Sequence, residues 1–196
     1  MSPQQSPAAA AGLAQGEPRH ASRAAAAPPL RDLQALERAC LGQGLPPASR
    51  MALRAASRLH DEPQAAERSL RQALALAPDH PATHIALYRF HFYGNRLAEA
   101  LAVGLGCLDC AARLNGLAAD WRAVRRTDAA FDGWNLLPRF YLFTLKACAY
   151  VSLRLGRDEQ GLAMLVKLQE LDHADQLGAA RLQSVFQRRG RDEDDD

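Results

Sequence analysis

Lysine is nearly absent from this chain of 196 residues, because only Lys146 and Lys167 are lysines among its 24 basic side chains. Together with the abundant alanine, this bias toward arginine is typical of a bacterial genome rich in G and C. Basic and acidic residues almost balance, at a formal net charge of +2, so the whole chain has no field that would attract nucleic acid or an anionic membrane. Any charged binding surface must therefore be local.

Cysteine is also scarce, and the four cysteines lie within helical apolar patterns, which excludes a small secreted scaffold built on disulfides. No run of about 18 apolar residues is present to cross a membrane. The first 30 residues lack the continuous apolar core of a secretory signal. These absences predict a cytoplasmic protein with reduced thiols and no membrane partner.

Motifs that carry chemistry are missing as well. The chain has no glycine-rich phosphate loop, no His-Glu-x-x-His, no Gly-x-Ser-x-Gly and no pair of carboxylates flanked by apolar segments. No residue is a candidate for catalysis, so we expect no enzyme activity, no cofactor and no small-molecule substrate. Arg125-Arg126 is only a two-residue basic cluster, which argues against nucleic acid as a partner.

The two ends of the chain differ in composition from its middle. Residues 1–29 are rich in Ala, Pro, Ser, Gln and Gly, and they offer too little apolar surface to offset the entropy lost on ordering. We predict that this segment is disordered. Apolar residues between Leu30 and Cys40 recur at helical spacing and predict a leading helix that ends near Gly42. Residues 189–196 form a charged tail with an acidic end.

Three stretches of the middle share one spacing. Arg-Leu-Ala-Glu-Ala-Leu-Ala at 96–102 returns loosely as Pro-Gln-Ala-Ala-Glu-Arg-Ser at 63–69 and as Arg-Asp-Glu-Gln-Gly-Leu-Ala at 157–163. Each stretch lies near the middle of a 34-residue unit and carries a small residue where two helices must touch. These small residues are Ala66, Ala100 and Gly161.

The units resemble the tetratricopeptide repeat, a helix-turn-helix unit of the same length. The resemblance implies an all-α fold: a short solenoid of three degenerate repeats with an N-terminal helix and a C-terminal capping helix that covers the last exposed face. It also implies that the protein binds another protein. The repeats would occupy about 47–80, 81–114 and 142–175, with an insertion at 115–141 and a cap at 176–188, in one domain at 30–188.

Helix positions follow from the repeats and from their proline and glycine residues. We expect helices over 48–59 and 64–76 in the first repeat and over 81–93 and 97–111 in the second. In the third repeat, Pro138 should begin an extended first helix. Gly161 inside a helix costs about 1 kcal/mol relative to alanine, so we expect close helix packing at that position as compensation.

The insertion is the part of the folded region that resembles the repeat least, and it contains both tryptophans, Trp121 and Trp134. Connections of this length are more often functional or packed than idle. Two interpretations stay open. The aromatic side chains of Trp121, Phe131 and Trp134 either fill the gap between the second and third repeats, which is the simpler interpretation, or contact a partner.

Three cysteines suggest an alternative function from another class. Cys107 and Cys110 are spaced like half of a zinc site on one helix face, and Cys148 should lie near Cys107. A metal-binding or redox accessory protein for metallocluster assembly would use these thiols. However, the repeat needs small or apolar buried residues at Cys107 and Cys148, and cysteine fills that role. His84 and His91 also fall at packing positions, so we assign no metal.

The resemblance also selects residues that would face a partner, because the first helix of each repeat in this family lines a concave groove. The selected side chains are basic or aromatic: Arg58, Arg89, Phe92, Tyr93, Phe143, Lys146, Tyr150 and Arg154. Such a groove favours an acidic or amphipathic segment of another protein, with the aromatic rings as apolar anchors. The protein would then act as a scaffold, an adaptor or a chaperone.

Two subclasses of the family can be compared directly. Domains that hold the C-terminal carboxylate of heat-shock chaperones use lysine, asparagine and arginine at positions that are occupied here by Met51, Ala55, Ala86, Phe143 and Ala147. That carboxylate clamp is missing. Small secretion chaperones that hold export substrates unfolded have a similar size and repeat number, and they remain an alternative.

Overall fold

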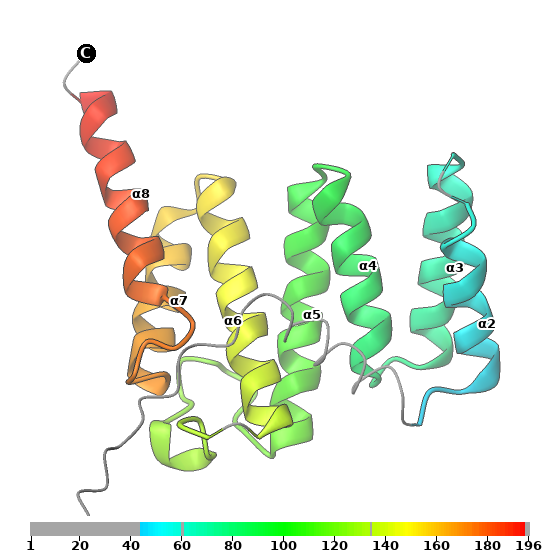
Figure 1. Ribbon diagram of the computed structural model, residues 1–196, viewed down its shortest axis with the longest axis horizontal. Coiled ribbons are helices and arrows are strands. Elements are labelled where there is room, and N and C mark those ends of the chain that lie inside the picture. Colours follow the sequence, from blue (N-terminus) through cyan, green and yellow to red (C-terminus); the bar gives the residue numbers. More distant parts are fainter. Residues whose placement is uncertain (1–43, 60, 134, 195–196) are drawn as a thin grey trace, which may run out of the picture.

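The computed structural model describes residues 44–59, 61–133 and 135–194, and within these ranges it contains seven α-helices, one short 3-10 helix and no β-strand (Figure 1). The segment 1–29 and the leading helix expected from Leu30 lie outside the described residues. The α-helices are α2 (Pro47–Ala56), α3 (Pro63–Leu76), α4 (Pro81–Tyr93), α5 (Leu97–Asn115), α6 (Leu136–Arg154), α7 (Asp158–Leu171) and α8 (Ala179–Asp194).

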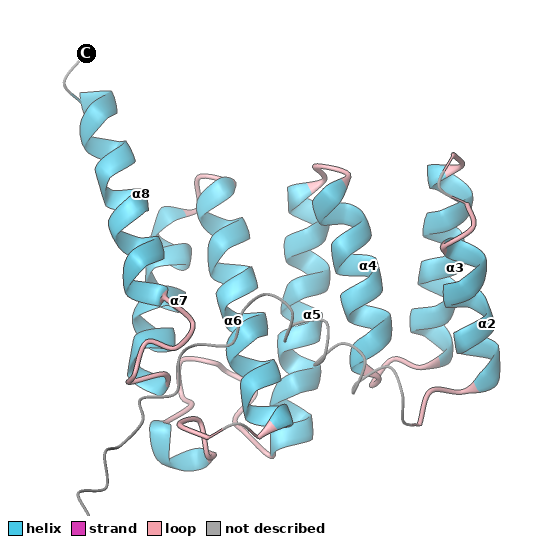
Figure 2. Ribbon diagram, viewed as in Figure 1, coloured by secondary structure: helices cyan, strands magenta, loops and turns pink. Residues whose placement is uncertain are grey.

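The helices pack in the order in which they follow one another along the chain. Each helix from α2 to α7 contacts its successor, and α6 additionally contacts α8. Figure 2 shows the resulting row of helices, which are joined by short loops except between α5 and α6. This serial packing confirms the predicted all-α, solenoid-like fold.

Proline and glycine residues place several helix ends. Proline stands at the first position of α2, α3 and α4, where its missing N–H would have no helical partner. Gly116 ends α5 with a φ of 66°, a left-handed conformation that favours glycine. Helix α4 spans the predicted residues, whereas α5 continues four residues past its predicted end at 111 and α6 begins two residues before Pro138.

The ends of α2 and α8 differ most from expectation. Helix α2 stops at Ala56 and not at 59. Helix α8 begins at Ala179, three residues after the predicted start of the cap, because the Asp175 carboxylate accepts the N–H of Ala179 at 2.6 Å and so caps the helix. At its other end α8 runs to Asp194, so the helix includes most of the expected charged tail.

Gly161 lies at the closest approach of α6 and α7. A Cβ atom at this position would lie 2.6 Å from two side-chain carbons of Leu153 and 3.1 Å from the carbonyl oxygen of Ala149. These distances confirm the close packing that we predicted from a glycine within a helix.

The main hydrophobic core joins α5, α6, α7 and the insertion. Leu145 and Leu165 are fully buried in it, together with Val124 and Phe131 of the insertion. Trp121 is only 8% exposed, and the Arg122 guanidinium lies 4.2 Å from the centre of its ring. Trp121 and Phe131 therefore pack as the simpler interpretation requires, while Trp134 lies outside the described residues.

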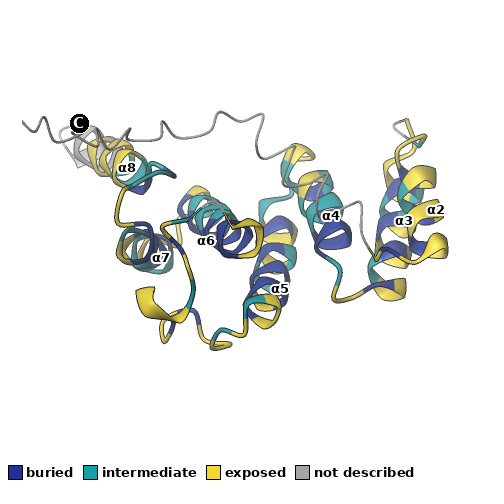
Figure 3. Ribbon diagram, turned by 60° about the horizontal axis from the view of Figure 1, so that its bottom comes forward, coloured by how far each residue is buried: buried dark blue, intermediate teal, exposed yellow. Residues whose placement is uncertain are grey.

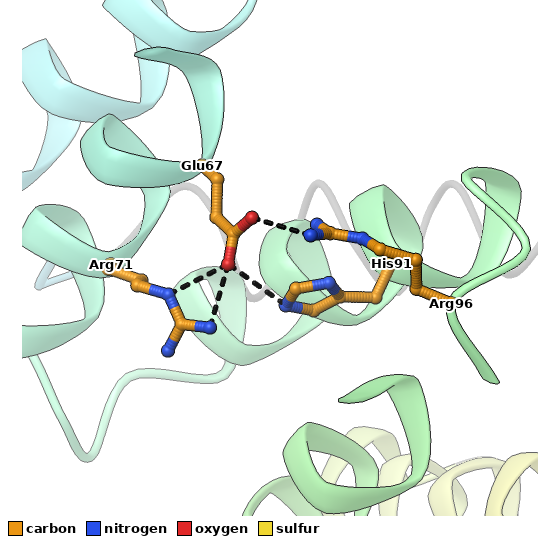
Figure 4. A network of polar contacts seen from close by, with 4 residues as sticks. All are labelled: Glu67, Arg71, His91 and Arg96. Atoms are coloured by element: carbon orange, nitrogen blue, oxygen red, sulfur yellow. Dashed lines mark hydrogen bonds and ion pairs between the residues drawn. The ribbon is translucent and has the colours of Figure 1, made fainter. Parts of the chain in front are cut away.

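A smaller second core and a cluster of charges join α2 and α3 to α4. The small core consists of Ala56, Leu70 and Leu87. Beside it, Glu67 of α3 accepts a hydrogen bond from Arg96 at 2.7 Å and another from Arg71 at 2.7 Å (Figure 4). These hydrogen bonds hold the pKa of Glu67 below its usual value. The charged cluster therefore adds polar contacts to this small core.

Glu67→Gln should lower the free energy of unfolding by about 1–2 kcal/mol near neutral pH, because the amide loses the charge that both arginines contact. The folded pKa of Glu67 is depressed, so this stabilisation is present above pH 4.5 and is lost as the pH falls through the folded pKa. Urea unfolding at neutral and acidic pH measures the effect. Glu62→Gln, at an exposed carboxylate beside α3, is the matched control. Equal effects of the two variants at neutral pH would contradict the prediction.

His91 is fully buried beside this cluster, with its Nε2 4.0 Å from the Glu67 carboxylate and no hydrogen bond to either ring nitrogen. His84 is also buried, and its Nε2 lies 2.6 Å from the carbonyl oxygen of Pro78. The predicted packing role of both histidines is confirmed by this burial. Burial is also the main cause that lowers the pKa of each imidazole.

His91→Phe should leave stability at neutral pH unchanged or slightly higher, because an apolar ring of similar shape removes two buried nitrogens without hydrogen bonds. The buried His91 has a lowered pKa, so the unfolded chain takes up a proton more readily than the folded protein as the pH falls. The free energy of unfolding should therefore decrease as the pH is lowered from about 7 to about 5. The His91→Phe variant should lose less stability over this pH range than the wild type. Some loss should remain, because the pKa of His84 is also lowered. Thermal unfolding across this range tests the prediction, which an unchanged pH dependence would contradict.

Candidate partner-binding groove

One cavity of about 730 Å³ lies between α4, α6 and α8. Gly104 and Cys107 of α5 contribute to it and are buried, so they form its floor. Figure 3 shows α4 and α8 on either side of α6, which is why side chains from three non-consecutive helices meet here. We call this cavity the groove.

Six of the eight predicted partner-facing residues line the groove: Arg89, Phe92 and Tyr93 from α4, and Phe143, Lys146 and Tyr150 from α6. On each helix they are spaced three, four or seven residues apart, apart from the adjacent pair Phe92 and Tyr93, so they share one helix face. The structure thus brings together the predicted residues of α4 and α6.

The other two predicted residues lie elsewhere. Arg154 stands at the end of α6 beside the groove, where its Nη1 donates to the Tyr150 hydroxyl at 3.2 Å. Arg58 follows the end of α2 and is exposed, outside the groove. Its expected place on a helix face does not exist, because α2 ends at Ala56.

Aromatic rings connect the two sides of the groove. Tyr88 and Phe92 stack with their centroids 5.7 Å apart, and Phe92 reaches Tyr150 of α6 at 6.1 Å. Burial raises the pKa of Tyr88, so its hydroxyl stays protonated. Tyr93 continues the row outward, 5.6 Å from Phe92, and is 73% exposed. The groove therefore offers a continuous aromatic surface that extends from a buried interior to solvent.

The charged side chains that line the groove are Arg89, Lys146 and Arg181, and no acidic residue is among its described lining. The Arg89 guanidinium lies 5.6 Å from the centre of the Tyr93 ring. Lys146 donates a hydrogen bond from its Nζ to the carbonyl oxygen of Leu177, and burial lowers its pKa. Lys146 therefore lines the groove as predicted, and its ammonium group also holds the turn that leads into α8.

Helix α8 contributes lining residues that the sequence did not predict, namely Arg181, Leu182 and Val185. Their position depends on the turn before the helix. The buried carboxylate of Asp172 accepts the N–H of Leu177 at 2.7 Å and that of Gln176 at 3.1 Å. The turn directs α8 along one side of the groove. The apolar spacing of Leu182 and Val185 was visible in the sequence, but it indicated only a cap.

The three thiols of the alternative metal site have separate contacts. Cys107 Sγ lies 3.9 Å from the Thr144 hydroxyl, and Cys110 Sγ donates to the carbonyl oxygen of Asp79 at 3.2 Å. Cys148 is fully buried, which raises the pKa of its thiol to about 12 and opposes the thiolate form that binds metals. Within the described residues, no three His, Cys, Asp or Glu side chains are placed to hold a metal ion.

No family model matches this chain, and no solved structure matches it. The chain is similar to an "uncharacterized 19.8 kDa protein in nifW 5′ region" of Azotobacter chroococcum mcd 1, with 43% identity over 124 residues. The alignment covers 62% of this chain and 69% of that protein. In the described part of the chain, no helix is both long enough and apolar enough to cross a membrane.

Proposed function

This chain belongs to the family of the 19.8 kDa protein of the nifW 5′ region, and we propose that it is a non-enzymatic protein-binding module with tetratricopeptide-like repeats. It holds a segment of another protein in the groove between α4, α6 and α8 and acts as a scaffold, an adaptor or a chaperone. The place of the relative in a nif region supports an accessory role related to nitrogenase.

The observation that carries this proposal is the composition of the groove. Six aromatic side chains and three cations line it, whereas no acidic side chain is among its described lining. Aromatic and arginine residues are enriched among the side chains that dominate the binding energy at protein interfaces. Tyr93 and Val185 leave apolar surface exposed at the rim, where a partner would cover it.

The repeat assignment is part of the proposal. Helices α4 with α5 and α6 with α7 form consecutive packed pairs, and the first helix of each pair lines the groove. This is the arrangement that the tetratricopeptide resemblance implies. It gives a reason why residues at equivalent positions of two repeats meet at one surface.

A double variant of the rim tests the proposed function. Arg89→Glu with Tyr93→Ala changes two exposed side chains and should reduce partner capture at least about 10-fold, since both residue types are typical hot spots. Capture is measured by quantitative mass spectrometry with the tagged protein in extract of the organism that encodes it. Arg54→Glu with Met51→Ala, at exposed positions of α2, is the matched control and should retain all partners. Equal capture by both variants would refute the groove as the binding site.

A further inference from the structure

We infer that the occupant of the groove is an amphipathic helix with carboxylates, and that it lies along α6 between α4 and α8. Helix α8 is then one wall of the binding site and more than a cap. This inference rests on the proposed protein-binding function and specifies the shape and charge of the bound segment.

The position of α8 gives the first reason. The capping contacts of this region come from buried Leu177 and Ala179 and from Leu182 and Phe186, which pack against the main core. Val185 is not among these core contacts. The helix nevertheless turns Leu182 and Val185 toward the groove, and Val185 is 49% exposed. Val185 therefore faces the groove with half of its surface uncovered. A helix laid beside α6 would cover this surface at the usual distance between packed helices, about 8–10 Å.

The scarcity of hydrogen-bonding groups gives the second reason. An extended segment carries backbone N–H and C=O groups that need partners when they are buried. Among the described lining residues there is no asparagine or glutamine, and the Thr144 hydroxyl is already bonded to the carbonyl oxygen of Phe140. The other polar side chains are three tyrosines and three cations, which offer few acceptors for the N–H groups of an extended segment. A helix satisfies its backbone groups internally and presents apolar side chains at every third or fourth position. The aromatic surface is therefore suited to a helix.

Charge gives the third reason. Arg89 on α4, Arg154 at the end of α6 and Arg181 on α8 are exposed cations around the groove. Lys146 is engaged with Leu177 and adds to the positive potential from within. Carboxylates on the flanks of a bound helix would meet these arginines, which favours association and orients the helix. A basic helix would be repelled.

Three synthetic peptides labelled with fluorescein test this inference by fluorescence anisotropy with the full-length protein. Each has about 18 residues, a length of roughly 27 Å as a helix. The first has leucines on one helical face and glutamates on the other. The second replaces the glutamates with lysines, and the third is the glutamate peptide with a central proline that breaks the helix. The glutamate peptide should bind at least about 10-fold more tightly than the other two.

Variants of α8 test the wall directly. Arg181→Glu should make the protein bind the lysine peptide more tightly than the glutamate peptide. Val185→Asp should weaken binding of the glutamate peptide at least about 10-fold. Both residues are exposed, so the variants should keep the circular dichroism spectrum and melting temperature of the wild type. Arg188→Glu, an exposed arginine on α8 that does not line the groove, is the matched control.

The outcomes separate this inference from the proposed function. The inference is overturned if the proline peptide binds as tightly as the helical one, if the glutamate peptide shows no measurable binding, or if both α8 variants bind like the wild type. If the protein self-associates and Arg181→Glu abolishes that self-association, the occupant is a second copy of the chain. That result would also overturn the inference. In each of these cases, loss of partner capture by the Arg89→Glu, Tyr93→Ala variant would leave the proposed function standing.

Discussion

Gly161→Ala is expected to lower the free energy of unfolding by about 1–3 kcal/mol, although alanine is the better helix former by about 1 kcal/mol. The reason is overpacking between α6 and α7. The added Cβ would lie 2.6 Å from side-chain carbons of Leu153, which is 6% exposed and has little room to move. Urea unfolding of the variant measures the loss.

A second substitution isolates the cause. Leu153→Ala removes the side chain that the new methyl group would meet, so Gly161→Ala in that background should be close to neutral or stabilising. A double-mutant cycle gives the coupling free energy. Gly161→Ala should cost at least about 1 kcal/mol less in the Leu153→Ala background than in the wild type. An equal cost of Gly161→Ala in both backgrounds would show that overpacking against Leu153 is not the cause.

Asp172→Ala is expected to lower the free energy of unfolding by about 2–3 kcal/mol, because it leaves two N–H groups without their carboxylate acceptor. Asp172 is 3% exposed, and its two oxygens hold the N–H groups of Gln176 and Leu177. These bonds set the turn before α8, so the helix should detach from the groove. Amide hydrogen exchange should then show faster exchange in α8 with protection retained in α4 and α5.

Asp172→Asn is the matched control, because the amide side chain keeps one oxygen acceptor. This variant should lose less free energy of unfolding than Asp172→Ala. The detached helix also affects binding, because Arg181 and Val185 would leave the groove. Asp172→Ala should therefore weaken binding of the glutamate peptide, even though residue 172 does not line the groove. Unchanged protection of α8 in this variant would contradict the role of the turn.

Most of the helices, and the α4 and α6 sides of the groove, could be predicted because local rules determine them. Proline at the first turn places the starts of α2, α3 and α4, and glycine allows the turn that ends α5. Once a helix and its register are known, residues such as Phe143, Lys146 and Tyr150 must share one face. The repeat spacing then relates α6 to α4, so their groove-facing residues followed from the sequence.

The remaining features depend on particular side-chain hydrogen bonds, some within one turn and one between residues far apart in the sequence. The direction of α8 is set by hydrogen bonds of Asp172 and Asp175 with backbone N–H groups and by the bond from Lys146 to Leu177. None of these bonds leaves a periodic pattern in the sequence. The bond to Leu177 also gives Lys146 a structural role that the sequence did not predict. Arg58 lies outside the groove because α2 ends at Ala56, and no glycine in the sequence marks that early end.

Site-specific photocrosslinking in the living cell tests most directly whether partners bind in the groove. A benzoylphenylalanine at Phe143, inside the groove, is compared with one at Val166, which is 55% exposed on α7 and does not line it. Illumination should join position 143 to another protein, through a segment whose apolar and acidic residues alternate at helical spacing. Position 166 should give no such product. Crosslinks to a partner from position 166 with none from position 143 would contradict the groove as the binding site.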